Sequence, residues 1–106
     1  MSQTEHKFVL PIGYWDNRGN LHREGVMREA TAGDEILPLK DPRVQANPGY
    51  LFIMVLSRVV VSLGGLDTIT TRIIEELRTG DYLYLLDFYK RINHHETHAA
   101  PEGKES

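Results

Sequence analysis

Residues 7–20 read KFVLPIGYWDNRGN, and this stretch sets the architecture of the N-terminal part of the chain. Its first nine residues alternate apolar side chains at a period of two, which predicts a β-strand. Pro11 has no N–H to donate to a sheet ladder, which favours an edge strand or a bulge beside Gly13. Residues 16–20 tolerate positive φ, so the chain should reverse there and return along residues 21–30 as a β-hairpin. The apolar face of the first strand carries Phe8, Leu10, Ile12 and Tyr14.

After the hairpin the sequence predicts helices. Thr31 and the acidic residues that follow it are typical of a helix start. Asn47 and Pro48 open a second helix, with asparagine as N-cap and proline in the first helical position. We predict a loop between Pro38 and Pro42, because proline interrupts a continuing helix.

Residues 50–63 are almost entirely apolar, which predicts a helix that lies centrally or is covered by a partner subunit. Residues 59–61 are three valines, whose β-branched side chains leave a strand as the alternative for the end of this segment. A further helical stripe ends at Gly80. This stripe consists of Ile69, Ile73, Ile74 and Leu77.

The last helix is predicted to begin at Asp81, with the aspartate as its cap. Asp87 and Arg91 lie one turn apart on this helix and should form an ion pair. The face predicted to join the core carries Tyr82, Leu85, Leu86, Tyr89 and Ile92. Residues 94–106 are polar and without periodicity, which predicts a disordered tail.

These elements predict one α+β domain over residues 7–93, with an N-terminal β-hairpin packed on a small cluster of three to four helices. Residues 1–6 are expected to be flexible and residues 94–106 disordered. A chain of 106 residues is long enough for one modest hydrophobic core.

The composition argues against several classes of function. The formal net charge is −3 and the twelve Lys and Arg residues are scattered, so a nucleic-acid-binding surface is not expected. The absence of cysteine excludes disulfides and thiolate sites and fits a reducing cytoplasm. Residues 50–63 fall short of the ~20 residues that a membrane span needs, and residues 1–7 lack the apolar core of a signal peptide. We therefore expect a cytoplasmic protein that binds neither membranes nor nucleic acid.

One cluster carries metal-ligand side chains, namely His94, His95, Glu96 and His98. His94 and His98 would share a face if the last helix continued that far. A frayed, polar terminus would lose much of the free energy of metal binding to ordering, so we expect adventitious binding at most.

A second polar cluster, His22, Arg23 and Glu24, follows the predicted turn and could place an acid or base beside Asp16. No nucleophile and no oxyanion-binding loop accompany it, so a solvated hairpin face is the better interpretation. We predict no catalytic, cofactor-binding or metal-ligating residue, no cofactor, and no enzymatic activity.

The last helix has more apolar side chains than one face can bury. Leu83, Tyr84 and Phe88 lie outside its core stripe, which predicts contact with a protein partner or self-association as a homo-oligomer. The alternative is that the hairpin packs on this second face. Tyr50 and Phe52, at the start of the apolar helix, complete the predicted partner-binding set.

An ordered pattern runs from residue 7 to residue 93. It consists of Leu10-Pro11, Gly13-Tyr14, Gly19, His22-Arg23, Met27-Arg28, the run from Ala30 to Glu35, Asp41, Arg43, Asn47-Pro48, Tyr50, Leu56-Ser57-Arg58, Asp81 and Tyr84-Leu85. This pattern resembles the small tail-assembly proteins of contractile-tailed bacteriophages and phage-tail-like particles, which include tail assembly chaperones and baseplate-hub assembly proteins. The resemblance implies a protein-binding role in tail assembly, with the tape-measure or baseplate-hub protein as partner, and no catalytic residues. The alternatives are a cytoplasmic protein-interaction adaptor unrelated to phage and, less favoured, a metal-dependent enzyme that uses the C-terminal histidines.

Overall fold

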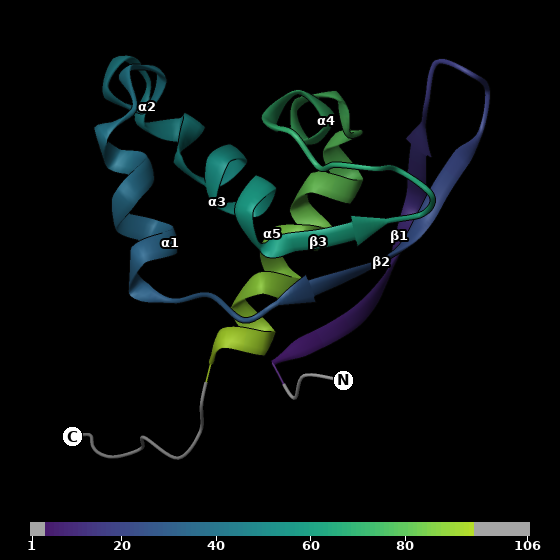
Figure 1. Cartoon of the computed structure of the whole chain (residues 1–106), viewed down its shortest axis with the longest axis horizontal. Helices are drawn as coiled ribbons and strands as arrows, with labels where there is room; N and C mark the ends of the chain where they lie inside the picture. The colour runs from purple at the N-terminus through teal and green to yellow at the C-terminus, as the bar shows by residue number, and fades with distance from the viewer. Residues whose placement is uncertain (1–3, 95–106) are drawn as a thin grey trace.

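The computed structural model describes residues 4–94, which form a three-stranded antiparallel sheet and a set of helices (Figure 1). The strands are β1 (Glu5–Trp15), β2 (Leu21–Arg28) and β3 (Val60–Leu63), in the order β1-β2-β3. The predicted α+β class and N-terminal hairpin are confirmed, and β1 begins two residues before its predicted start. From residue 95 onward, the tail that we predicted to be disordered lies outside the described residues.

The hairpin contains the predicted irregularity in β1. The register of β1 against β2 shifts between Val9 and Tyr14, and Pro11 lies within this interval. Gly13 has a φ of 111°, in the region that favours glycine. The turn is held by Asp16, whose Oδ1 accepts hydrogen bonds from two backbone N–H groups later in the turn. A bulge at the predicted position therefore shapes the end of the hairpin.

Five α-helices occur among the described residues, more than the three to four that we predicted. The expected loop between Pro38 and Pro42 is a 3-10 turn followed by a short helix. Proline fits there because the first N–H groups of a helix need no intrahelical partner, and Asp41 caps the short helix by accepting from the Arg43 N–H at 2.8 Å. The elements are α1 (Ala32–Ile36), η1 (Leu37–Lys40), α2 (Pro42–Ala46), η2 (Pro48–Tyr50), α3 (Leu51–Val59), α4 (Thr71–Glu76) and α5 (Thr79–Asn93).

The apolar segment 50–63 changes from helix to strand after Val59. The strand alternative is therefore correct for Val60 and Val61 but not for Val59, which ends the helix. Strand β3 pairs with β2 through Gly25 opposite Leu63. A Cβ atom at Gly25 would lie only 2.5 Å from the Ser62 carbonyl oxygen and from the Phe8 ring. Glycine at this position allows β3 and the Phe8 side chain to approach β2 closely.

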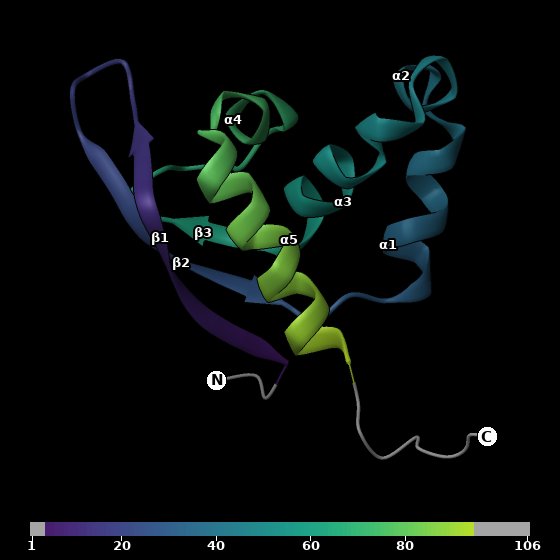
Figure 2. The same cartoon turned by 180° about the vertical axis from the view of Figure 1, so that it is seen from behind.

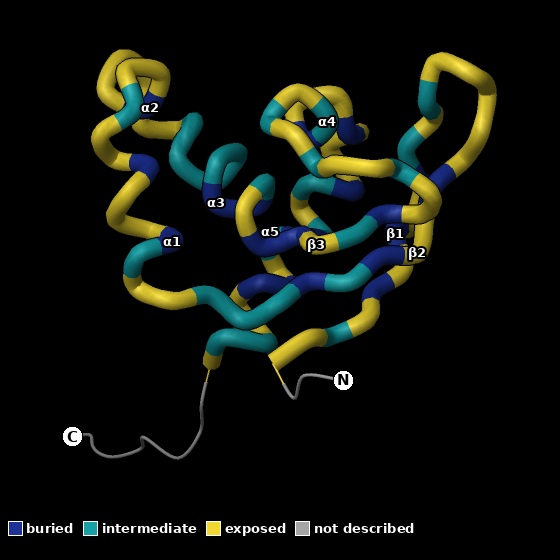
Figure 3. Tube along the Cα trace, viewed as in Figure 1, coloured by how far each residue is buried: buried dark blue, intermediate teal, exposed yellow. Residues whose placement is uncertain are grey.

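Helix α5 packs against β1, and the core lies between them and the inner sides of α3 and α4 (Figures 2 and 3). Leu85 and Tyr89, both predicted as core residues, are buried. The predicted ion pair joins Asp87 and Arg91 at 2.9 Å. The largest fully buried apolar side chains are Leu10, Met27, Leu56, Leu63, Ile74 and Leu85.

Candidate protein-binding surface

The surplus apolar face of α5 packs largely on the hairpin. Phe88 is buried with its ring 5.7 Å from that of Phe8 in an edge arrangement, and Tyr84 stacks on Phe88 at 6.0 Å. The hairpin therefore packs on the rings of Tyr84 and Phe88, as the alternative prediction stated. Phe88 offers no free surface to a partner. Of the three predicted partner-binding residues on α5, Leu83 alone is largely exposed, at 57%.

The other two predicted partner-binding residues differ in their surroundings. The Tyr50 hydroxyl donates a hydrogen bond to the Glu75 carboxylate, and the Arg43 guanidinium lies 5.3 Å from the Tyr50 ring centroid. Tyr50 thus connects helix α2, through Arg43, with helix α4, through Glu75. Phe52 is half-buried and meets Tyr89 edge-on, with ring centroids 5.4 Å apart. Phe52 also lines an open groove.

This groove lies between η2, the first turn of α3 and α5, and its volume is about 600 Å³. We call it the α3–α5 groove. Its apolar lining consists of Pro48, Leu51, Phe52, Tyr82, Leu86 and Tyr89. Glu35 and Lys90 add one charge of each sign to the lining. A concave, mostly apolar site with a few polar groups is typical of a binding site.

Hydrogen bonding holds one side of the α3–α5 groove in shape. The Tyr89 hydroxyl donates to Glu35 of α1. Burial, together with this hydrogen bond, raises the pKa of Tyr89 above its ordinary value, so the phenol keeps its proton and remains a donor. The Tyr89 ring is therefore fixed before any partner binds, which lowers the entropic cost of binding.

The sequence did not predict the α3–α5 groove. Tyr82 and Leu86 belong to the stripe that we assigned to the core, but both are only half-buried. The surplus of apolar residues on α5 was the available signal for a binding surface. It did not show which face another element of the fold would cover.

Asp34 is a buried carboxylate, 2% exposed, that pairs with two arginines. Arg28 donates from its two terminal nitrogens at 2.7 and 2.9 Å, and Arg58 donates from Nε at 3.0 Å. The Thr31 backbone N–H donates another hydrogen bond at 2.8 Å. The hydrogen bonds from Arg28 are the main cause that holds the pKa of Asp34 well below its ordinary value. Asp34 therefore ties β2, α1 and α3 together.

Asp81 is fully buried and does not cap its helix, so our prediction of a cap is wrong. Helix α5 begins at Thr79 with Arg78 as N-cap. The two carboxylate oxygens of Asp81 instead accept the backbone N–H groups of Ile12 and Gly13 at 2.9 and 2.8 Å. These groups lie in the irregular part of β1, where the sheet ladder is interrupted. Asp81 thus satisfies donors that the bulge exposes.

Two members of the cluster that we considered for acid–base chemistry, His22 and Arg23, make structural contacts. Gly65 N–H donates to His22 Nδ1 at 3.2 Å, which assigns the ring proton to Nε2, and Nε2 donates to Asp16 Oδ2 at 2.8 Å. This hydrogen bond from His22 is the main cause that holds the pKa of Asp16 well below its ordinary value. Arg23 Nε donates to the Leu10 carbonyl oxygen at 2.9 Å. The cluster joins the turn to the segment that follows β3.

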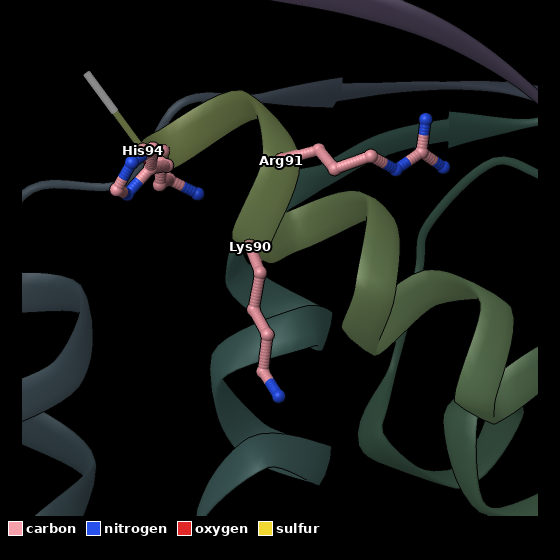
Figure 4. A pocket seen from close by; sticks show the side chains of 4 residues that line it. Lys90, Arg91 and His94 are labelled. Atoms are coloured by element: carbon pink, nitrogen blue, oxygen red, sulfur yellow. The ribbon is translucent and has the colours of Figure 1, made fainter. Parts of the chain in front are cut away.

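A pocket of about 810 Å³ lies at the C-terminal end of α5 and is lined by Lys90, Arg91, Asn93 and His94. The side chains of Lys90, Arg91 and His94 point away from one another, so their nitrogens do not converge on one ligand (Figure 4). The other members of the histidine cluster, at positions 95–98, lie outside the described residues. Within residues 4–94, no group of three or more His, Asp or Glu side chains is placed to hold a metal ion.

Comparison of this chain with protein-family models, curated proteins and solved structures gave no match. Over residues 4–94, no helix combines the length and the apolar character that crossing a membrane requires. Function must therefore be inferred from the surfaces of the molecule itself, and the α3–α5 groove has a mostly apolar lining.

Proposed function

We propose that this protein is a non-catalytic protein-binding factor in the assembly of a bacteriophage tail or a tail-derived injection particle. The α3–α5 groove carries this proposal, because Phe52, Tyr82 and Leu86 leave apolar surface open there. Aromatic side chains in a concave site are common anchors of protein interfaces. We place the activity in the cytoplasm of the bacterial host.

The assignment to a phage tail rests on the resemblance of residues 7–93 to small tail-assembly proteins. The candidate partners are accordingly the tape-measure protein and the baseplate-hub protein. A chaperone that leaves the particle and a minor component that stays in the baseplate would both need a protein-binding surface of this kind.

The shape of the α3–α5 groove favours a helix of the partner. From Tyr82 to Tyr89 the groove follows α5 over about 10 Å of helix axis. A partner helix could place apolar side chains one and two turns apart along that length. Glu35 and Lys90 in the lining would contact polar side chains beside that apolar stripe.

We expect Leu86→Glu to weaken partner binding about tenfold or more, because it replaces an apolar contact of the groove with a carboxylate that must lose its water when a partner covers it. Tagged wild-type and variant proteins would be purified from lysate of the native host, and the co-purifying chains quantified by mass spectrometry. Circular dichroism would first establish that the variant is folded. Leu83→Glu is the matched control, since it makes the same change on the same helix outside the groove lining.

Recovery of tail-tube, hub or tape-measure proteins by the wild type and Leu83→Glu, with loss for Leu86→Glu, would support the proposal. Loss for Leu83→Glu instead would move the binding site to the exposed side of α5. If no tail protein is recovered, the tail assignment is wrong. The presence or absence of the chain in purified particles would then separate a baseplate component from a chaperone.

A further inference from the structure

A further pocket lies between the tip of the hairpin and α4, and its volume is about 550 Å³. The β1–β2 turn extends away from the rest of the sheet, beside α4 in both views (Figures 1 and 2). Five of the residues that line this turn pocket are aromatic or charged, namely Tyr14, Trp15, Asp16, Arg72 and Glu76. The turn pocket shares no lining residue with the α3–α5 groove, so a ligand bound there would be independent of the proposed function.

Trp15 is the only tryptophan of the chain, and its exposure of 60% is the highest among the large hydrophobic residues that the structure describes. It lies at the end of β1, opposite Leu21 on β2. A tryptophan buried in the core would stabilise the fold, but this one leaves most of its surface in water. Exposed tryptophans are strongly enriched among the residues that dominate protein interfaces.

The charged side chains that line the turn pocket are mainly acidic. Two carboxylates, those of Asp16 and Glu76, line the turn pocket against a single guanidinium, that of Arg72. The Glu76 carboxylate is fixed in position, since Tyr14 Oη donates to it at 2.9 Å and Arg72 Nε donates to it at 3.2 Å. Arg18, the cation of the turn itself, is not among the lining residues. The pocket therefore combines an accessible indole with a net negative lining.

We propose that the turn pocket binds an arginine or lysine side chain of a protein partner, with the cation against Trp15 and near the carboxylates of Glu76 and Asp16. Tryptophan is the aromatic side chain that attracts cations most strongly. The carboxylates add a favourable charge interaction that orients the partner. An acidic side chain would fit poorly, because the one cation in the lining is already paired with Glu76 and a second carboxylate lies close by.

The emission of Trp15 offers a direct measurement, because no other tryptophan contributes to the signal. The full-length protein would be titrated at low ionic strength with an acetylated and amidated hexa-arginine peptide. We expect a saturable change in Trp15 emission that weakens when the salt is raised to about 0.15 M. A hexaglutamate peptide should produce no change. Calorimetry with Trp15→Leu, which lacks the reporter, should show no binding of hexa-arginine.

Glu76→Gln should raise the dissociation constant for hexa-arginine about fivefold. Glu75→Gln is the matched control, because Glu75 is also exposed on α4 and also accepts from a tyrosine hydroxyl, but it does not line the turn pocket. A response without saturation, an equal response to hexaglutamate, or equal weakening by Glu75→Gln would overturn the proposal. Leu86→Glu should leave this titration unchanged, so the result is independent of the α3–α5 groove.

Discussion

Asp34→Asn is expected to lower the free energy of unfolding by about 3 kcal/mol. The Asp34 carboxylate is nearly fully buried and receives hydrogen bonds from Arg28 and Arg58. An asparagine would leave both guanidinium groups without their counter-charge, and its NH₂ group would face donors instead of acceptors. The expected loss is at the low end for a buried ion pair, because both arginines keep part of their side chains in water.

Urea unfolding followed by circular dichroism measures this loss. Asp87→Asn is the matched control, since Asp87 also pairs with an arginine, Arg91, but on the exposed side of α5. Exposed ion pairs contribute little, so this control should leave the unfolding midpoint almost unchanged. Equal stabilities for Asp34→Asn and Asp87→Asn would mean that the buried pair does not hold β2, α1 and α3 together.

The Asp34 pair also predicts how stability depends on pH. In the folded protein the pKa of Asp34 lies well below the ordinary value of 3.8 that applies to the unfolded chain. Because the unfolded chain binds the proton more readily, the stabilisation is present above that ordinary value and is lost as the pH falls below it. The difference in unfolding free energy between wild type and Asp34→Asn should therefore shrink from about pH 5 downward. A difference that stays constant into the acid range would contradict this assignment.

Local rules explain why the hairpin and the helix starts were predictable. The period of two in β1 and the caps at Thr31 and Asn47 each act over a few residues. The end of the apolar segment was harder to predict, because valines at 59–61 suit a strand while the preceding residues suit a helix. Whether this end becomes helix or strand depends on pairing with β2, which is far away in the sequence. Gly25 of β2 has no side chain, and this allows β3 to approach closely.

The binding surfaces were less predictable than the fold. Periodicity shows which residues of α5 share a face, but not which other element covers that face. Tyr84 and Phe88, predicted to meet a partner, pack on Phe8 of the hairpin. Tyr82 and Leu86, predicted for the core, line the α3–α5 groove. These assignments require the packing of β1 and α3 around α5, which the sequence pattern of a single helix does not contain.

Two of the aspartates at landmark positions of the phage-tail resemblance, Asp34 and Asp81, have buried structural roles in this fold. Asp34 belongs to the pattern that begins with Met27 and Arg28, and it pairs with that arginine. Asp81 marks the start of the last helix and holds the bulge of β1. At these two positions the aspartates stabilise the fold. In the function that we propose, the choice of partner depends instead on surface residues such as Trp15 and Leu86, which take no part in those hydrogen bonds.

Asp81→Ala is expected to lower the free energy of unfolding by about 3 kcal/mol. The substitution removes the acceptor of two backbone N–H groups, those of Ile12 and Gly13, at a bulge where β2 provides no regular ladder. A buried donor without an acceptor costs the full penalty of its lost hydration. Asp81→Asn should lose less, because its one amide oxygen can still accept from one of the two groups.

Hydrogen exchange separates this role from a general loss of stability. In Asp81→Ala the amides of Ile12 and Gly13 should exchange faster by a larger factor than those of the regular pairs between β1 and β2, because only the bulge loses its acceptor. Asp67→Ala is the control, since Asp67 is an exposed aspartate in the segment between β3 and α4. If the Asp81 variant unfolds more easily but all β1 amides accelerate equally, Asp81 stabilises α5 and not the bulge. Selective acceleration at Ile12 and Gly13 would show that one side chain of α5 completes the hydrogen bonding of the hairpin and sets how the two elements pack.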